Sequence, residues 1–291
     1  TVKDDSKSVV MVGDISHFLL RETEQVAPDR FYNIGICEPT IINMAAGLSK
    51  IGLIPVVHTI APFITERAYE QIKLDFGYQQ LAINIISVGG AFDYSQLGCS
   101  HHCYTDVSLF SHLKRANIFI PGSAKEFKVL FKQAYLNGGI NYFKLTEYPH
   151  GLEFSQTEIS VGKGITVREG NDVTIAVTGS QLKNAVEVSE RLKEKNISVD
   201  IIYFHTLKPF DGELIKKSLI KTRRLLTVEE LSSHDGLFNL CLKSVIGLND
   251  LRIEQIAIDD FVYGYGTYTE LCQRSGLSAD NIYKNVISLM N

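Results

Sequence analysis

The sequence predicts an α/β protein with two domains, each a mostly parallel sheet flanked by helices. Short β-rich runs alternate with helical patterns along the chain, which is typical of parallel sheets covered by helices. Runs such as INIISV at 83–88 are dense in β-branched residues, as expected of strands buried on both faces. The chain has 291 residues, of which 45% are hydrophobic, so it can bury more than one core.

The first half alternates strands with helices. β-branched and apolar runs predict strands at 8–12, 31–34, 54–59, 83–88, 117–120 and 142–145. Helical periodicity predicts helices near 16–26, 39–50, 62–80, 105–113 and 124–136. These elements make up the first predicted domain, residues 1–150.

A Gly- and polar-rich stretch at 151–164 is interpreted as a linker, and the second domain follows at 165–291. Its expected strands are 172–177, 197–203 and 224–228, and its expected helices are 180–194, 211–220, 236–246 and 279–289. The aromatic-rich stretch 259–271 is interpreted as a loop packed on this domain. A surface that binds a partner is the alternative, because aromatic residues are enriched in interfaces.

Composition narrows the class of protein. A net charge of −4 gives no reason to expect nucleic acid or an anionic membrane as a partner. No apolar run approaches the roughly 18 residues that span a bilayer, and the first residues, TVKDDSKS, lack the apolar core of a signal peptide. Five cysteines, an odd number, indicate reduced thiols rather than a disulfide framework. We therefore expect a cytoplasmic protein.

One carboxylate stands in an unusual place. The segment FYNIGICEPTIINMAAGL, residues 31–48, puts Glu38 between a glycine-containing turn and a nearly all-apolar helical stretch. Pro39 suits the first position of a helix, so Glu38 is expected to be its N-cap. A carboxylate withdrawn from water usually has a partner or a function. The alternative is a carboxylate that the helix dipole merely stabilises.

Two short motifs suggest other chemistry. CSHHC at 99–103 contains residue types that bind zinc, but a second separated ligand pair is not evident, so we expect no metal site on this chain. A histidine in this stretch could instead bind a substrate hydroxyl or move a proton. VTGSQ at 177–181 could bind an anion at a helix N-terminus. The nucleotide motifs G-x-x-x-x-G-K-[ST] and G-x-G-x-x-G are missing.

In order and spacing, the motifs resemble the C-terminal half of transketolases. VGDISHF, PDRFYNIGICEPTIINMAAGL and PVVHTIAPFITERAYEQI resemble the pyrimidine-binding domain of that family, with one inserted residue near Glu66. The likeness continues through INIISVGGAF, GCSHH and IPGSAKE. DVTIAVTGSQLKNAVEVSERL, FHTLKPFD and LLTVEE resemble the C-terminal transketolase domain. The resemblance covers essentially the whole chain and implies both domain folds.

The resemblance also implies a cofactor, thiamine diphosphate, and residues that bind it. In transketolases the glutamate of G-[IV]-x-E bonds a ring nitrogen of the aminopyrimidine and so helps to deprotonate the thiazolium carbon; Glu38 occupies that position. Phe63 matches an aromatic residue that packs on the pyrimidine, although it could simply be a core residue. Ile60 stands where a second aromatic is common, so we expect an aliphatic contact there. His101 aligns with a histidine that faces the substrate, and His102 follows it.

Three departures from the family pattern matter. The chain has no G-D-G…N motif, which in transketolases holds magnesium and the diphosphate on an N-terminal domain. Leu97 replaces an acidic residue and Gly89 a histidine, both of which normally contact sugar hydroxyls. TEYPH at 146–150 lacks the arginine that grips the substrate phosphate. These changes favour a specialised sugar substrate over the ordinary pentose phosphates.

We therefore expect the C-terminal subunit of a split transketolase, which transfers a two-carbon ketol unit between sugar or sugar-phosphate substrates. Glu38 and His101 are the expected catalytic residues, and Glu38, Ile60 and Phe63 the expected cofactor contacts. An N-terminal transketolase-like subunit with G-D-G…N would supply magnesium, in a hetero-oligomer that contains a homodimer of this chain.

Two alternatives stay open. 1-Deoxyxylulose-5-phosphate synthases and the β-subunits of 2-oxo-acid dehydrogenases share this domain order, so the cofactor could serve a different reaction. The chain could also be a non-catalytic assembly subunit.

Overall fold

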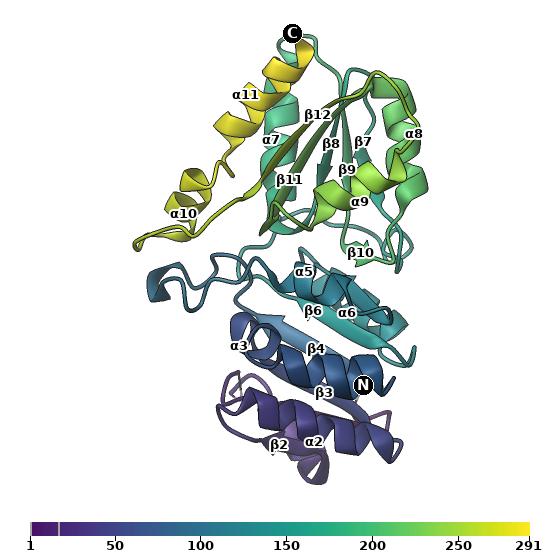
Figure 1. Cartoon of the computed structure of the whole chain (residues 1–291), viewed down its shortest axis with the longest axis vertical. Coiled ribbons are helices and arrows are strands. Elements are labelled where there is room, and N and C mark those ends of the chain that lie inside the picture. The colour runs from purple at the N-terminus through teal and green to yellow at the C-terminus, as the bar shows by residue number, and fades with distance from the viewer. Residues whose placement is uncertain (1, 17) are drawn as a thin grey trace.

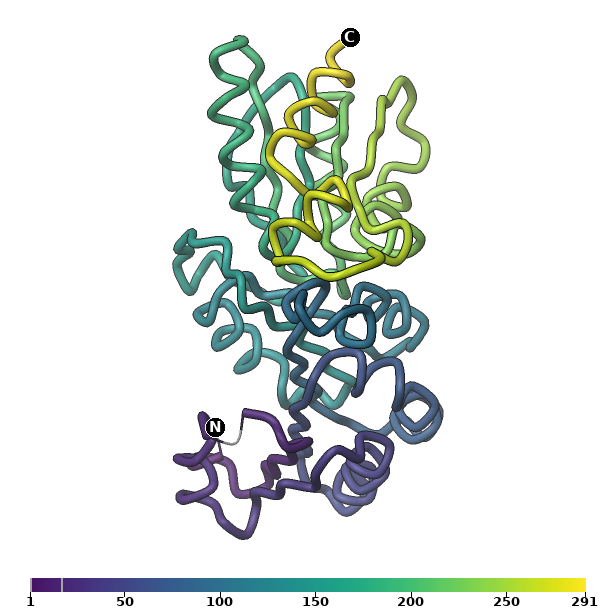
Figure 2. The backbone as a smooth tube through the Cα atoms, turned by 90° about the vertical axis from the view of Figure 1, so that its left-hand side faces the viewer, coloured from purple at the N-terminus to yellow at the C-terminus, as the bar shows by residue number. Residues whose placement is uncertain are grey.

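The computed structural model consists of two stacked sheets with helices packed on them (Figure 1). It describes residues 2–16 and 18–291. The larger sheet has seven strands in the order β10-β5-β6-β4-β3-β1-β2, and the smaller has five in the order β12-β11-β8-β9-β7. Figure 2 shows the same arrangement from the side, with the first part of the chain at one end and the C-terminus at the other. The predicted fold class is confirmed.

The larger sheet comes mainly from the first half of the chain. Its strands are β1 (Ser8–Val12), β2 (Phe31–Asn33), β3 (Ile54–Ile60), β4 (Ile83–Val88), β5 (Ala116–Phe119), β6 (Ile140–Lys144) and β10 (Thr206–Lys208). Neighbouring strands are parallel, except that β10 pairs antiparallel with β5. The sequence did not predict β10. Because this strand comes from the second half, it ties that half to the first sheet.

The helices of the first half differ from prediction in one region. They are α1 (Arg21–Val26), α2 (Glu38–Lys50), α3 (Ala61–Thr65), α4 (Tyr69–Gln71), α5 (Asp106–Ser111) and α6 (Ala124–Ala134). The single helix expected at 62–80 is wrong, because α3, α4 and a π-helical segment, η2 (Ile72–Tyr78), occupy that stretch. Ala68 leaves helical geometry (φ −104°, ψ 15°) and so separates α3 from α4. Of the helix expected at 16–26, residue 17 lies outside the described residues.

The second half builds the smaller sheet. Its strands are β7 (Ile165–Arg168), β8 (Val173–Val177), β9 (Val199–Tyr203), β11 (Arg224–Ser232) and β12 (Arg252–Ile258). Its helices are α7 (Leu182–Lys193), α8 (Gly212–Thr222), α9 (Leu237–Ser244), α10 (Tyr268–Arg274) and α11 (Ala279–Met290). Short 3-10 turns lie at Pro28–Arg30, Ser95–Leu97 and Gly179–Gln181. The pair α7 and α11 covers one face and the pair α8 and α9 the other (Figure 1).

Apolar packing continues from one sheet to the other. Strands β1, β6, β8 and β9 are buried along their whole length, as expected of a parallel sheet. Each of the two apolar clusters contains residues of both halves: Phe143 and Ile175 belong to one, and Ile85 and Ile202 to the other. The two halves therefore share their cores.

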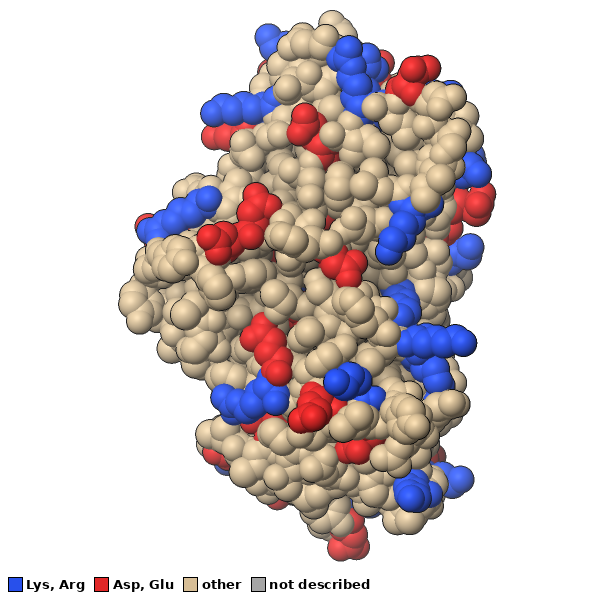
Figure 3. Space-filling model, viewed as in Figure 1, with Lys and Arg blue, Asp and Glu red and all other residues tan. Residues whose placement is uncertain are grey.

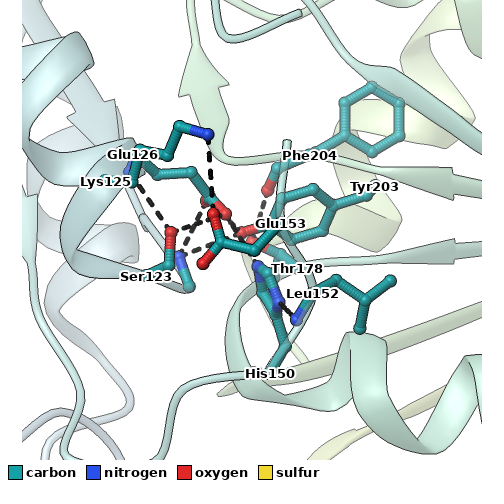
Figure 4. Close-up of polar contacts among 10 residues, drawn as sticks. Ser123, Lys125, Glu126, His150, Leu152, Glu153, Thr178, Tyr203 and Phe204 are labelled. Atoms are coloured by element: carbon teal, nitrogen blue, oxygen red, sulfur yellow. Dashed lines mark hydrogen bonds and ion pairs between the residues drawn. The ribbon is translucent and has the colours of Figure 1, made fainter. Parts of the chain in front are cut away.

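A buried polar cluster also joins the halves (Figure 4). Glu126, at the start of α6, accepts hydrogen bonds from the Tyr203 hydroxyl (2.7 Å) and the Gly122 N–H (2.9 Å). His150 Nε2 lies 2.7 Å from the other carboxylate oxygen. Burial alone would raise the pKa of Glu126, but these partners outweigh it and lower that pKa. The cluster links α6 to β9. It includes His150, which is the last residue of the first predicted domain.

The exterior has mixed charge. On the face seen in Figure 1, acidic and basic side chains are interspersed (Figure 3). Over the described part of the chain, every helix is too short or too polar to cross a membrane.

Carboxyl groups also gather where the halves meet. Asp93 is buried and accepts hydrogen bonds from the Thr146 hydroxyl and the Glu147 N–H, both at 3.0 Å. Burial, with the negative charge of Glu230 nearby, raises the pKa of Asp93 to about 7. In the unfolded chain this carboxyl has an ordinary pKa, about 4. The folded protein therefore binds an extra proton between these two values.

This proton makes stability depend on pH. Since the folded state holds more protons than the unfolded state between about pH 4 and pH 7, the free energy of unfolding contributed by Asp93 falls as pH rises through that window. We expect Asp93→Asn to flatten the dependence by up to about 1.4 kcal/mol per pH unit. Urea unfolding at pH 5, 6, 7 and 8 measures both slopes, with Asp259→Asn, an exposed carboxyl, as the control. Identical slopes for wild type and Asp93→Asn would contradict the assignment.

Candidate active site

Glu38 is the first residue of α2 and is only 1% exposed. The prediction that Glu38 is the N-cap is wrong by one residue, because Cys37 holds the non-helical N-cap conformation (φ −140°, ψ 58°). The Cys37 carbonyl accepts the first helical hydrogen bond, from the Ile41 N–H. Pro39, lacking an N–H, is tolerated within the first turn. The Glu38 carboxylate is therefore not used to cap its own helix.

One oxygen of this carboxylate is paired and the other is not. Glu38 Oε2 accepts a hydrogen bond from Arg67 Nη1 at 2.8 Å, and the two side chains form an ion pair. Glu38 Oε1 is buried and has no hydrogen-bond partner among the described residues. An unsatisfied buried acceptor costs about 1–3 kcal/mol. The site therefore presents a carboxylate oxygen that lacks a donor.

Arg67 links Glu38 to the aromatic side chain that the sequence singled out. Its guanidinium carbon lies 4.3 Å from the centre of the Phe63 ring, in a cation–π contact. Phe63 lies in α3, and Ile60 is the residue at which β3 ends and the N-cap of α3. The break after α3 brings Arg67 within reach of both groups. Sequence reasoning missed Arg67, although the inserted residue near Glu66 marked the irregularity that positions it.

His101 lies beside Phe63, on the loop that follows β4. The two rings meet edge to face, with centres 5.1 Å apart and planes at 71°. Burial lowers the pKa of His101, so its imidazole is neutral near pH 7 and can both donate and accept a hydrogen bond. The structure thus joins Glu38 to Phe63 through Arg67 and places His101 against Phe63.

The other residues of CSHHC do not gather around a common point. Cys99 is exposed, whereas Cys103 is buried with Sγ 3.6 Å from the Thr65 hydroxyl oxygen. Burial raises the pKa of the Cys103 thiol, which keeps it protonated. His102 is buried against the ring of Phe92, at 5.2 Å between centres. Within the described ranges, no group of three or more His, Cys, Asp or Glu side chains could hold a metal ion.

A buried ion pair fixes the base of the loop that carries His101. Lys144 Nζ donates to Asp106 Oδ1 at 2.9 Å and to the Cys103 carbonyl at 3.0 Å, and the Tyr142 hydroxyl donates to Asp106 Oδ2. Ala91 and Cys103 exchange backbone hydrogen bonds of 2.7 and 3.0 Å, which close the loop. Burial disfavours the charge on Lys144, but Asp106 outweighs it and raises the pKa of the ammonium. The sequence did not indicate this pair.

The topology explains why these residues meet. Glu38 follows β2, Phe63 follows β3 and His101 follows β4, and these strands lie on one side of a parallel sheet in the order β4-β3-β1-β2. Their carboxyl ends share one edge, which is where α/β sheets bind ligands. A groove of about 980 Å³ lies elsewhere, on the sheet face lined by Val10, Val56 and Ile86.

Known proteins match the chain along nearly its whole length. The family model of the transketolase pyrimidine binding domain matches residues 2–147, and that of the transketolase C-terminal domain matches residues 162–282. The 6-deoxy-6-sulfo-D-fructose transketolase subunit SqwH of a Clostridium species is 26% identical over 91% of this chain and 83% of its own length. A subunit of the apulose-4-phosphate transketolase of Phocaeicola vulgatus is 28% identical over 99% of this chain and 90% of its own length.

A solved structure also matches the chain over nearly its whole length. A split gene transketolase, described as an inactive beta4 tetramer, superposes with a TM-score of 0.90 at 28% identity, over 99% of this chain and 94% of that one. The order of the two matched domains agrees with the two sheets described above. The chain therefore belongs to the transketolase family, of which it contains the pyrimidine-binding domain followed by the C-terminal domain.

Proposed function

We propose that this chain is the C-terminal subunit of a thiamine-diphosphate-dependent transketolase that transfers a two-carbon ketol unit between sugar or sugar-phosphate substrates. The pyrimidine-binding domain of the family implies this cofactor. One observation carries the proposal: the buried Oε1 of Glu38 lacks a donor, while its other oxygen is bonded to Arg67, whose guanidinium packs on the Phe63 ring. An aminopyrimidine offers a ring nitrogen for such an oxygen and a flat face for an aromatic ring, so the residues present fit the group.

When bound, thiamine diphosphate supplies the carbon nucleophile that cleaves a ketose. In the proposed site, Glu38 would share one proton with the pyrimidine nitrogen, donating it as a carboxylic acid to the neutral ring or accepting a hydrogen bond as a carboxylate from the protonated ring. Phe63 and Ile60 pack against the ring and exclude water from the carboxylate. Arg67 balances the charge of Glu38, and because its side chain is 46% exposed, it is free to move when the ring enters. His101, as a neutral imidazole, binds or deprotonates a substrate hydroxyl.

We further propose that a second, N-terminal transketolase-like subunit with the G-D-G…N motif binds the diphosphate through magnesium. The assembly would be a hetero-oligomer that contains a homodimer of this chain. Two similar proteins are named as transketolase subunits, and the similar tetramer of beta chains is described as inactive, which supports a divided site. The limits of the two family matches support a domain division at 151–164. The free cysteines support a cytoplasmic location.

Mixing the two subunits tests the proposal. We expect calorimetry with thiamine diphosphate and magnesium to give at least about 100-fold tighter binding to the mixture than to this chain alone, because each chain holds only one end of the cofactor. Ketol transfer from D-fructose 6-phosphate to an aldehyde should likewise require both chains. Tight binding or turnover by this chain alone would contradict a divided site. Decarboxylation of pyruvate by the mixture would favour the synthase-like alternative, and no turnover at all would favour an assembly role.

A further inference from the structure

Tyr94 occupies the space above Gly89, at the start of the loop that carries His101. Gly89 has a positive φ of 77°, and a Cβ built on it would lie only 2.3 Å from Cε2 of Tyr94. No side chain therefore fits at residue 89 while Tyr94 keeps this position. The ring of Tyr94 fills a place in the wall of the site that a longer side chain at residue 89 would otherwise take.

The ring of Tyr94 also continues a series of ring contacts that begins at Phe63, the proposed cofactor contact. Tyr94 and His101 meet edge to face, with ring centres 6.1 Å apart and planes at 86°, and His101 in turn lies 5.1 Å from Phe63. If Phe63 packs on the cofactor, as proposed above, Tyr94 lies two rings further out. Because His101 is proposed above to contact a substrate hydroxyl, its neighbour Tyr94 would lie beside the substrate as well.

The hydroxyl of Tyr94 is available there. It makes no hydrogen bond to any residue that the structure describes, and it is not a buried unsatisfied atom. Burial, with the negative charges of Glu147 and Asp93, raises the pKa of Tyr94, so the phenol stays neutral and can donate. Both its ring position and its free O–H therefore suit a contact with a substrate.

The charges around Tyr94 indicate which part of a substrate fits. Glu147 and Asp93 are the charged groups that act on it, and the nearby ammonium of Lys144 is already bound by Asp106 and the Cys103 carbonyl. Leu97, one turn along the loop, is 54% exposed and contributes no charge. A hydroxyl donor beside these two acidic side chains suits an uncharged hydroxyl group at this position rather than a phosphate.

We propose that Tyr94 is a specificity-determining residue that donates a hydrogen bond to a hydroxyl group on an uncharged part of the sugar substrate. This inference rests on the proposed ketol transfer and names the substrate chemistry of the same site.

The test compares acceptors with and without hydroxyls in the reconstituted two-subunit enzyme. With D-fructose 6-phosphate as donor, D-glyceraldehyde and propanal are the acceptor probes, and the variants are Tyr94→Phe and the control Tyr78→Phe, whose tyrosine is 84% exposed. Tyr94→Phe keeps the ring above Gly89 and removes only the O–H. We expect it to raise KM for D-glyceraldehyde about tenfold with kcat nearly unchanged, and to leave kcat/KM for propanal within about twofold.

Each other outcome is decisive. Equal losses with both acceptors would show that Tyr94 acts only on the fold, and unchanged kinetics with both would show that its hydroxyl is not used; either overturns the inference while ketol transfer stands. An inactive wild-type mixture would overturn the ketol transfer and this inference together. Thiamine diphosphate titration and thermal unfolding of Tyr94→Phe should match wild type.

Discussion

Glu38→Ala should lower the turnover of the two-subunit enzyme by about 10²–10⁴-fold without lowering the stability of this chain. The activity falls because the proposed proton-sharing carboxyl is gone. The stability is kept because the substitution removes a buried oxygen that has no donor, Glu38 Oε1, and leaves Arg67 with a half-exposed side chain that water can solvate. A large loss of activity without a loss of stability is expected of a residue that serves function and is not needed for folding.

The matched measurements are steady-state ketol transfer and thermal unfolding. Glu38→Gln keeps the shape of the side chain but cannot share a proton, so its turnover should fall nearly as far. Glu70→Gln, at an exposed position of α4, should change neither quantity. If Glu38→Ala loses stability and keeps its turnover, the carboxylate only supports the start of α2 and the mechanism is wrong.

Glu38 could be found from the sequence, whereas its partner could not. A carboxylate that interrupts an apolar helical segment is visible as a local pattern, because the expected burial follows from its neighbours alone. Arg67 fell within the single helix predicted at 62–80, and no local pattern marked it. Its role depends on where that helix breaks, and the break at Ala68 brings it against Glu38 and Phe63. Contacts between elements are set by tertiary packing, which local periodicity does not encode.

The fold also has parts that the local sequence predicts and parts that only tertiary packing determines. The central parallel strands were predictable because both of their faces are buried, which favours runs dense in β-branched apolar residues, such as 83–88. The edge strands β7, β10 and β12 were missed: β7 has four residues and β10 three, and most positions of β12 are exposed or half-buried. Tyr94 was missed because Gly89 stood out only as the replacement of a family histidine, which did not point to Tyr94. The side chain that fills the space above a glycine is known only from the structure.

Lys144→Met should give the largest loss of stability, about 3–5 kcal/mol, because it leaves Asp106 buried without its countercharge. The two residues are 5% and 0% exposed, so water cannot replace the lost partner. Urea unfolding measures the loss. Lys125→Met, which breaks an exposed ion pair of 3.5 Å with Glu153, should change stability by less than about 1 kcal/mol. Similar losses for the two lysine variants would contradict the role given to burial.

A double variant separates this charge effect from the positioning of the loop. Replacing both partners, as Lys144→Met with Asp106→Leu, should recover much of the stability, since apolar side chains often replace a buried ion pair without loss. It cannot restore the hydrogen bond from Lys144 to the Cys103 carbonyl, which holds the loop beneath His101. We therefore expect the double variant to stay well below wild type in turnover. Recovery of both stability and turnover would show that Lys144 serves only to neutralise Asp106.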